Sequence, residues 1–222
     1  MPPIYLSESD VGRLVTIKDA MAALEALFAT WGQPSTTNLP RQRAPLPGGA
    51  FNLMGAAYGA KGVHGLKAYA GVKGAQFHAL LYSSLDGSLK AVIEADLFGQ
   101  MRTGAASGIA TRLLANAHAR TLGVIGTGKQ SRMQVAAVCT VRPIRQVRVF
   151  SRTAEHREAY ARSLQSEPAW PKPTWWSPSP SQPSRCAGRS GSPKARTSTL
   201  PAPTPTLVAR LTRKRCCAPL SR

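Results

Sequence analysis

The last quarter of this 222-residue chain lacks acidic residues altogether. All ten Asp and Glu lie at or before Glu167, and residues 168–222 also contain no Ile, Phe, Tyr, Met, Asn or His. The same segment holds eleven of the eighteen prolines and ten Lys or Arg. Such a segment cannot bury enough apolar surface to offset its chain entropy, so we expect residues 168–222 to be a disordered basic tail.

Long apolar runs and clustered cysteines are also missing. No apolar run approaches the roughly 20 residues that a membrane span needs, and residues 1–10 lack the basic-then-apolar order of a secretory signal. The four cysteines form no Cys-x-x-Cys pair and no Cys/His cluster, so neither a metal site nor a disulfide framework is expected. We therefore expect a cytoplasmic protein without a bound metal.

The formal net charge of +19 would ordinarily suggest a nucleic-acid or membrane partner. About half of this charge lies in residues 168–222, where no regular aromatic spacing accompanies it. We favour chance basicity and expect no specific nucleic-acid partner. A basic nucleic-acid-binding arm is the alternative that we rank last.

Residues 1–118 have the pattern of an antiparallel α+β domain. Ile4–Val15 is interpreted as extended, apolar spacing predicts a helix from Ile17 to near Gly32, and the four prolines of residues 33–49 predict a loop. Four short strands and a long Ala-rich helix should follow, at Ala50–Ala57, Gly65–Tyr69, Phe77–Ser83, Lys90–Ile93 and Ala95–Ala119.

A β-α-β pattern begins at Thr121. Strands are predicted at Thr121–Ile125 and Gln146–Phe150, and helices at Gln130–Cys139 and Ala154–Leu164. This alternation is typical of a parallel sheet, and residues 168–222 offer it no further strand. We therefore expect an α/β chain in which residues 119–167 form an incomplete Rossmann-type domain.

The most informative local signal is the sequence GTGKQS at residues 126–131, directly after a strand and opening a helix. Gly126 allows a tight turn, Gly128 lets a pyrophosphate approach the backbone, and the free N–H groups of the helix start face the anion. Ser131 stands where a third Gly or Ala is usual. Thr127, Lys129 and Gln130 complete the candidate cofactor-binding turn, and an ordinary βα turn is the alternative.

After the second strand, Ser151, Arg152 and Thr153 occupy the place where an acidic residue would bind the ribose 2′-hydroxyl. Hydroxyl and guanidinium groups there suit a 2′-phosphate. We therefore expect NAD(P) as cofactor, with NADP favoured over NAD.

Three cations of residues 1–118 are candidates for binding an anionic substrate. Arg41 lies on a loop, Lys67 on a strand and Arg102 at a helix start. For Lys67 taken alone, a solvated surface charge is the better interpretation. Arg102 precedes the small residues 104–107 (GAAS), which would let another backbone or a ligand come close.

Taken in order, these motifs resemble the ornithine cyclodeaminase/mu-crystallin family over about residues 4–164. The strongest matches are GLK (65–67) with GAQF (74–77), IEAD (93–96) with RTGAAS (102–107), and GTGKQ (126–130) with VRVFSR (147–152). The resemblance implies a two-domain enzyme, usually a homodimer through its first domain. It moves hydride between NAD(P) and the α-carbon of an amino or imino acid. Members include cyclodeaminases, which are lyases, ketimine and pyrroline-2-carboxylate reductases, and alanine dehydrogenases.

The matching positions imply roles for individual residues. Arg41, Lys67 and Arg102 would hold the substrate carboxylate by charge-assisted hydrogen bonds. Lys67 would also lie close to the reacting nitrogen, which makes it the catalytic candidate, and Thr103 would contact the cofactor.

The chain departs from the family pattern after residue 167. Where members continue with a hydrophobic strand and a GTHVN…GAN segment, residues 171–176 read PKPTWW. Reading the tail codons from their third base can restore both features, so we expect an out-of-frame tail, with a true divergent tail as the alternative. The chain itself should then show little or no turnover, and a non-catalytic ligand-binding remnant is the second functional interpretation.

Overall fold

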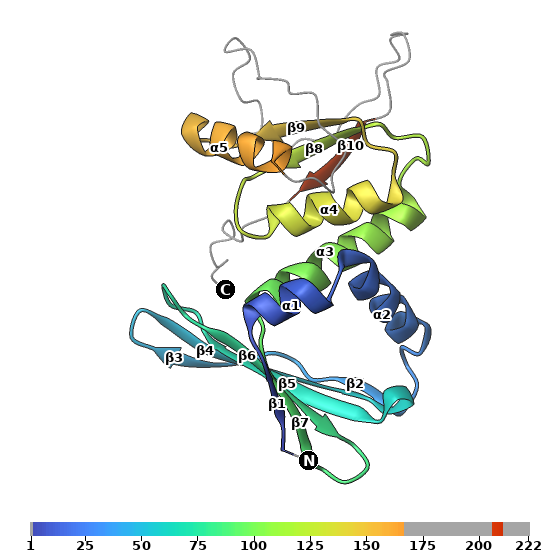
Figure 1. Ribbon diagram of the computed structural model, residues 1–222, viewed down its shortest axis with the longest axis vertical. Helices are drawn as coiled ribbons and strands as arrows, with labels where there is room; N and C mark the ends of the chain where they lie inside the picture. The colour runs from blue at the N-terminus through green and yellow to red at the C-terminus, as the bar shows by residue number, and fades with distance from the viewer. Residues whose placement is uncertain (1, 167–205, 211–222) are drawn as a thin grey trace, which may run out of the picture.

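The computed structural model describes residues 2–166 and 206–210, an α/β arrangement built on two sheets (Figure 1). In chain order the elements are β1 (Ile4–Leu6), α1 (Glu8–Leu14), α2 (Ile17–Ala29), β2 (Thr36–Asn38), β3 (Gln42–Leu46), β4 (Gly49–Tyr58), η1 (Gly59–Lys61), β5 (Val63–Ala70), β6 (Phe77–Ser83), β7 (Leu89–Glu94), α3 (Asp96–Leu114), β8 (Thr121–Ile125), α4 (Ser131–Val141), β9 (Gln146–Phe150), α5 (Ala154–Gln165) and β10 (Thr206–Arg210). No helix among these residues combines the length and the apolar character that crossing a bilayer requires.

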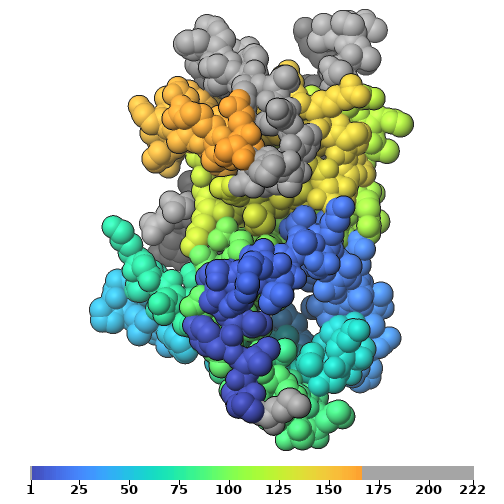
Figure 2. Space-filling model, viewed as in Figure 1, coloured from blue at the N-terminus to red at the C-terminus, as the bar shows by residue number. Residues whose placement is uncertain are grey.

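The first sheet has seven strands in the order β1-β7-β6-β5-β4-β2, with β3 also paired to β4. All its pairings are antiparallel except that of β1 with β7. In Figure 1, α1 and α3 lie over one side of this sheet, and in the space-filling view the N-terminal residues, in dark blue, run from the middle of the molecule down to its lower end (Figure 2). The predicted α+β character of the first part is therefore confirmed.

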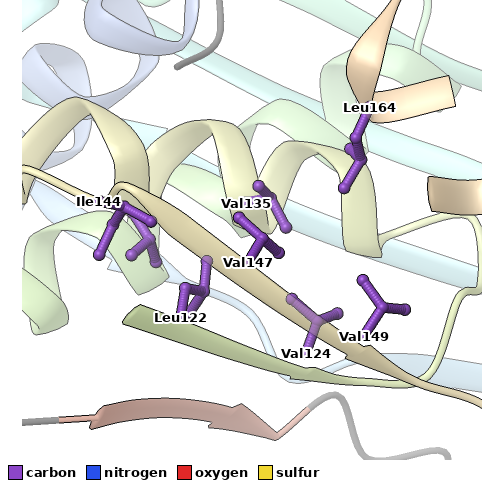
Figure 3. Packing of buried hydrophobic residues seen from close by; sticks show 8 residues of the cluster. Leu122, Val124, Val135, Ile144, Val147, Val149 and Leu164 are labelled. Carbon is purple, nitrogen blue, oxygen red and sulfur yellow. The ribbon is translucent and has the colours of Figure 1, made fainter. Parts of the chain in front are cut away.

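The second sheet is parallel and has the order β10-β8-β9. Alternate residues of β8 and β9, namely Leu122, Val124, Val147 and Val149, point to one side of the sheet and are buried. They pack with Val135 of α4 and with Leu164 of α5 (Figure 3). Burying each such side chain stabilises the fold by about 1.5–3 kcal/mol.

Two expectations for the first 50 residues are wrong. Ile4–Val15 is not extended throughout, because the capping box of Ser7 and Asp10 starts the short helix α1. Residues 33–49 are not only a loop, since β2 and β3 both pair with β4. Backbone pairing with a strand distant in sequence makes these segments extended, and periodicity cannot reveal such a partner.

The expectation that residues 168–222 offer no further strand is wrong for Thr206–Arg210. This segment pairs in parallel with β8, from Thr206 opposite Thr121 to Arg210 opposite Ile125. The sequence TLVAR is short, but an open edge of β8 offers it a row of backbone hydrogen-bonding groups. The expected disorder, the reading-frame shift and the nucleic-acid arm otherwise concern residues 167–205 and 211–222, which lie outside the described residues.

Helix α3 joins the two sheets and packs along α4. A Cβ atom added to Gly104 would lie 2.3 Å from the carbonyl oxygen of Met133 in α4. The neighbouring Ala105 is fully buried. The small residues that follow Arg102 therefore allow a close helix-helix approach, as the sequence predicts.

Candidate functional site

Lys67 lies in the middle of β5, where the register places it beside Met54 of β4 and Ala79 of β6. Its Nζ donates a hydrogen bond of 3.2 Å to the carbonyl oxygen of Ala95, the residue before α3. The side chain is half-buried. Lys67 is therefore not the solvated surface charge that we favoured for this residue taken alone.

Charged groups from three other segments, namely α1, the residue before β3 and α3, act on Lys67. Burial lowers the pKa of Lys67 below its ordinary value of 10.5, and Arg102 and Arg41 lower it further. Asp96 and Glu8 act in the opposite direction and raise this pKa. The fold thus brings together the three cations that the sequence suggested, although they are separated by up to 61 positions along the chain.

Carboxylates that sequence reasoning missed lie beside these cations. Glu8 accepts hydrogen bonds from the backbone N–H groups of Asp96 and Leu97, at 2.6 and 2.9 Å, and so caps α3, whose own N-cap residue offers no side-chain bond. Glu94 in turn accepts from the backbone of Glu8 at 2.7 Å, which holds the pKa of Glu94 below its usual range. The Ser7–Asp10 capping box was the available sequence signal that Glu8 opens a helix.

A pocket of about 210 Å³ opens next to this charged group. Its lining includes Phe77 of β6 and Asp96 at the start of α3. Because Phe77 also contacts the Lys67 ammonium, the pocket and the cations belong to one site. Within residues 2–166 and 206–210, no three His, Cys, Asp or Glu gather in a way that could hold a metal ion.

The glycine turn occupies the position that its sequence predicts. Gly126 follows the last residue of β8, has a φ of 102°, and donates its backbone N–H to the Phe150 carbonyl at 2.8 Å. Only glycine adopts such a φ readily. Ser131, the first residue of α4, donates both its N–H and its hydroxyl to the Gly128 carbonyl, at 2.9 and 2.6 Å. Both glycines therefore lie between the end of a strand and the start of a helix.

The backbone of the turn is open at Gly128. A Cβ atom added to Gly128 would meet no atom within 4 Å, so the backbone there is open to an approaching group. The N–H groups at the start of α4 lie beside it, where the helix dipole favours an anion. The residues present thus fit a phosphate-bearing cofactor.

The remaining cofactor candidates lie at different places relative to this turn. Thr127 and Ser151 are in contact through their hydroxyls, at 3.4 Å, while Arg152 and Thr153 follow β9 on the exposed surface. Gln130 directly precedes α4. Thr103 instead donates its hydroxyl to the Gly99 carbonyl of its own helix, at 2.7 Å.

An ion pair joins the glycine turn to the cation site. The Lys129 ammonium contacts the Asp96 carboxylate at the start of α3. Asp96 also acts on Lys67, so one carboxylate lies between the turn and the cations. The two candidate sites are therefore adjacent.

Comparisons with known proteins point to one family. The family model for the ornithine cyclodeaminase/mu-crystallin family matches residues 2–169. A Delta(1)-pyrroline-2-carboxylate reductase of Bacillus cereus is 42% identical over 77 residues, which are 35% of this chain and 24% of that protein. Iminosuccinate reductase of Paracoccus denitrificans is 31% identical over 153 residues, covering 62% of this chain and 46% of that protein.

A solved structure extends the likeness to three dimensions. The Delta(1)-pyrroline-2-carboxylate reductase of Thermococcus litoralis, in complex with NADH and L-proline, superposes with a TM-score of 0.69 at 26% identity. The match covers 73% of this chain and 53% of that one. The chain thus spans about half the length of this structure, and half or less of the two curated relatives.

Proposed function

This chain belongs to the ornithine cyclodeaminase/mu-crystallin family, and from that premise we propose that it binds a nicotinamide dinucleotide at residues 126–130 and a small amino or imino acid beside Lys67. The observation that carries the proposal is the adjacency of an open glycine turn and the half-buried Lys67, which the exposed Arg41 and Arg102 accompany; Lys129 and Asp96 link the two. In this family the bound nicotinamide supplies or accepts the hydride.

Lys67 is the proposed catalytic residue, and Arg41 and Arg102 bind the substrate carboxylate with it. A half-buried cation such as Lys67 binds a carboxylate more strongly than an exposed one, because the local dielectric is lower and the hydrogen bond is charge-assisted. The lowered pKa of Lys67 leaves its ammonium more ready to give up a proton to a neighbouring group.

Titration with L-proline tests this assignment without requiring turnover. Lys67→Met and Arg102→Leu should each weaken binding about 10- to 100-fold, the loss expected for one charge-assisted hydrogen bond. Lys73→Met, at an exposed position of the loop between β5 and β6, is the matched control and should leave the affinity unchanged. Equal affinity in all variants would refute the carboxylate site.

We favour NADP over NAD because no acidic residue stands at positions 151–153 after β9. Ser151, Arg152 and Thr153 would hold the 2′-phosphate, and Thr127 supports Ser151 through its hydroxyl. Calorimetric titration with NADPH and with NADH separates the two. Arg152→Ala should weaken NADPH binding about 10-fold and leave NADH binding unchanged.

We expect the 222-residue chain to bind these ligands with little hydride transfer. The family match ends at residue 169, and residues 171–176 do not resemble the strand that the family places there. NADPH absorbance with pyrroline-2-carboxylate or ornithine measures this directly, and sustained turnover would show the expectation to be wrong. The nucleotide sequence across the codons for residues 166–171 shows whether an intact reading frame continues.

The face of the first sheet opposite Lys67 is proposed to bind a second copy of the chain. Met54 pairs with Lys67, so its neighbour Leu53 points to the other face, where a pocket of about 430 Å³ is lined almost entirely by apolar surface. Leu39 and Phe51 are also 56% and 39% exposed. Apolar exposure of this kind is typical of a protein interface. Leu53→Lys should convert a dimer to a monomer in analytical ultracentrifugation while leaving NADPH affinity unchanged.

A further inference from the structure

The Lys67 ammonium is held by groups that carry no charge. We call them the lysine cradle; they are the rings of Tyr69 and Phe77, the Ala95 carbonyl and the Cα of Gly99. The Lys67 Nζ lies 4.9 Å from the centroid of the Phe77 ring and 5.5 Å from that of the Tyr69 ring. These rings are themselves stacked, with centroids 4.8 Å apart.

Gly99 provides the remaining space for the ammonium. It is buried in the first turn of α3, and a Cβ atom added to it would lie 2.8 Å from the Lys67 Nζ. No other atom lies within 4 Å of that Cβ position, apart from chain neighbours and the helix's own backbone. Any larger residue at position 99 must therefore displace the Lys67 ammonium, while the rest of the helix can stay in place.

We propose that the lysine cradle is a positioning device for the Lys67 ammonium, fixing where it meets the substrate carboxylate and how readily it ionises. This inference deepens the proposed function, because it rests on the role of Lys67 given there. Tyr69, Phe77 and Gly99 act through Lys67 and are positioning residues.

The lysine cradle offsets part of the hydration free energy that the Lys67 ammonium loses on burial. Burial disfavours the charged amine, and it is the largest cause of the lowered Lys67 pKa. The negative faces of two rings and one carbonyl oxygen stabilise the same charge without adding a competing ion. The charged groups acting on Lys67 are Arg102 and Arg41, which lower its pKa, and Asp96 and Glu8, which raise it.

The two kinds of cradle residue predict opposite shifts. Phe77→Leu keeps the site apolar but removes one ring, so the Lys67 pKa should fall by about 0.5–1 unit. Gly99→Ala pushes the ammonium toward water, so the pKa should rise toward 10.5 because the desolvation is relieved. A purely structural role for these residues would produce neither shift.

Nuclear magnetic resonance of the full chain carrying [13Cε]-lysine measures the titration directly. The Lys67 signal is identified by its loss in Lys67→Arg. Phe28→Leu on α2, at a 47% exposed position, is the control for Phe77→Leu. Gly12→Ala, whose Cβ would lie an ordinary 3.5 Å from Leu97, is the control for Gly99→Ala. Tyr69→Leu replaces Phe77→Leu if that variant fails to fold.

Opposite shifts in the two cradle variants, with unchanged controls, would support the proposal. An unchanged Lys67 pKa in both variants, or shifts of the same sign, would overturn it. Addition of pyrrole-2-carboxylate to the same samples tests the proposed function separately. If pyrrole-2-carboxylate does not change the Lys67 resonance while the Lys67 pKa shifts as expected in the variants, the lysine cradle is supported and the carboxylate-binding role of Lys67 is refuted.

Discussion

Replacing Gly104 by Ala tests the close packing of α3 on α4 and its importance for the glycine turn. In an exposed helix interior this change stabilises a protein by about 1 kcal/mol, because Ala loses less backbone entropy on folding than Gly. At Gly104 the new Cβ atom would lie 2.3 Å from the carbonyl oxygen, 2.6 Å from the carbonyl carbon and 3.1 Å from the Cβ of Met133. Carbon atoms in good contact are about 3.5–4.0 Å apart, so the helices must separate by about 1 Å.

The packing loss should outweigh the gain in helix propensity. Two of the three close atoms belong to the backbone of α4 and cannot rotate away, so we expect a net loss of about 1–3 kcal/mol in the free energy of unfolding. Helix α4 begins at Ser131, directly after the turn, so its displacement should also weaken NADPH binding. Urea denaturation followed by circular dichroism, together with calorimetry, measures both effects.

Gly99→Ala in the same helix is the matched control. Its Cβ would meet only the flexible end of Lys67, so the helix should become more stable by up to about 1 kcal/mol. The two variants make the same chemical change in α3 and differ in what the added methyl group contacts. If Gly104→Ala raises the denaturation midpoint as Gly99→Ala does, the close helix contact is absent and the reasoning fails.

Three further predictions concern the second sheet and its junction with α3. Leu122→Ala should cost about 2–5 kcal/mol in the free energy of unfolding, because the side chain is fully buried, whereas Leu85→Ala, at a 93% exposed position, should change it by less than about 0.5 kcal/mol. Arg142→Ala should lower the free energy of unfolding by about 1–3 kcal/mol, because its guanidinium donates hydrogen bonds to three carbonyls at the C-terminal end of α3, at 2.8–2.9 Å. If Arg142→Lys keeps full stability, the guanidinium geometry is not what stabilises this junction. Burial raises the pKa of the Cys139 thiol from 9.0 to about 11, so the folded state binds the thiol proton more tightly than the unfolded state does. The stability that this proton contributes is present below pH 9 and should be lost as the pH rises from 9 to 11. Mass spectrometry of the Cys139 peptide should accordingly find much slower alkylation at pH 9 in the folded chain than in urea, and equal rates would contradict the burial.

The sequence predicted β8 and β9 of the second sheet closely because their signals are local. The alternating apolar residues of Thr121–Ile125 and Gln146–Phe150 define both strands to the residue, and the glycines at 126 and 128 mark the turn between strand and helix. The same local logic placed β6 at Phe77–Ser83. Periodicity and turn chemistry depend on neighbouring residues, so they can be read without knowing the fold.

The sequence by itself thus determined the family resemblance, the glycine turn and the identity of three candidate cations. The tertiary structure alone decided that Glu8 caps α3, that Asp96 lies between Lys129 and Lys67, and that β10 pairs with β8. It also decided that two rings and a buried glycine hold the Lys67 ammonium. Each of these contacts joins segments that are far apart along the chain or depends on how an element is oriented in space, and neither property leaves a periodic signal in the sequence.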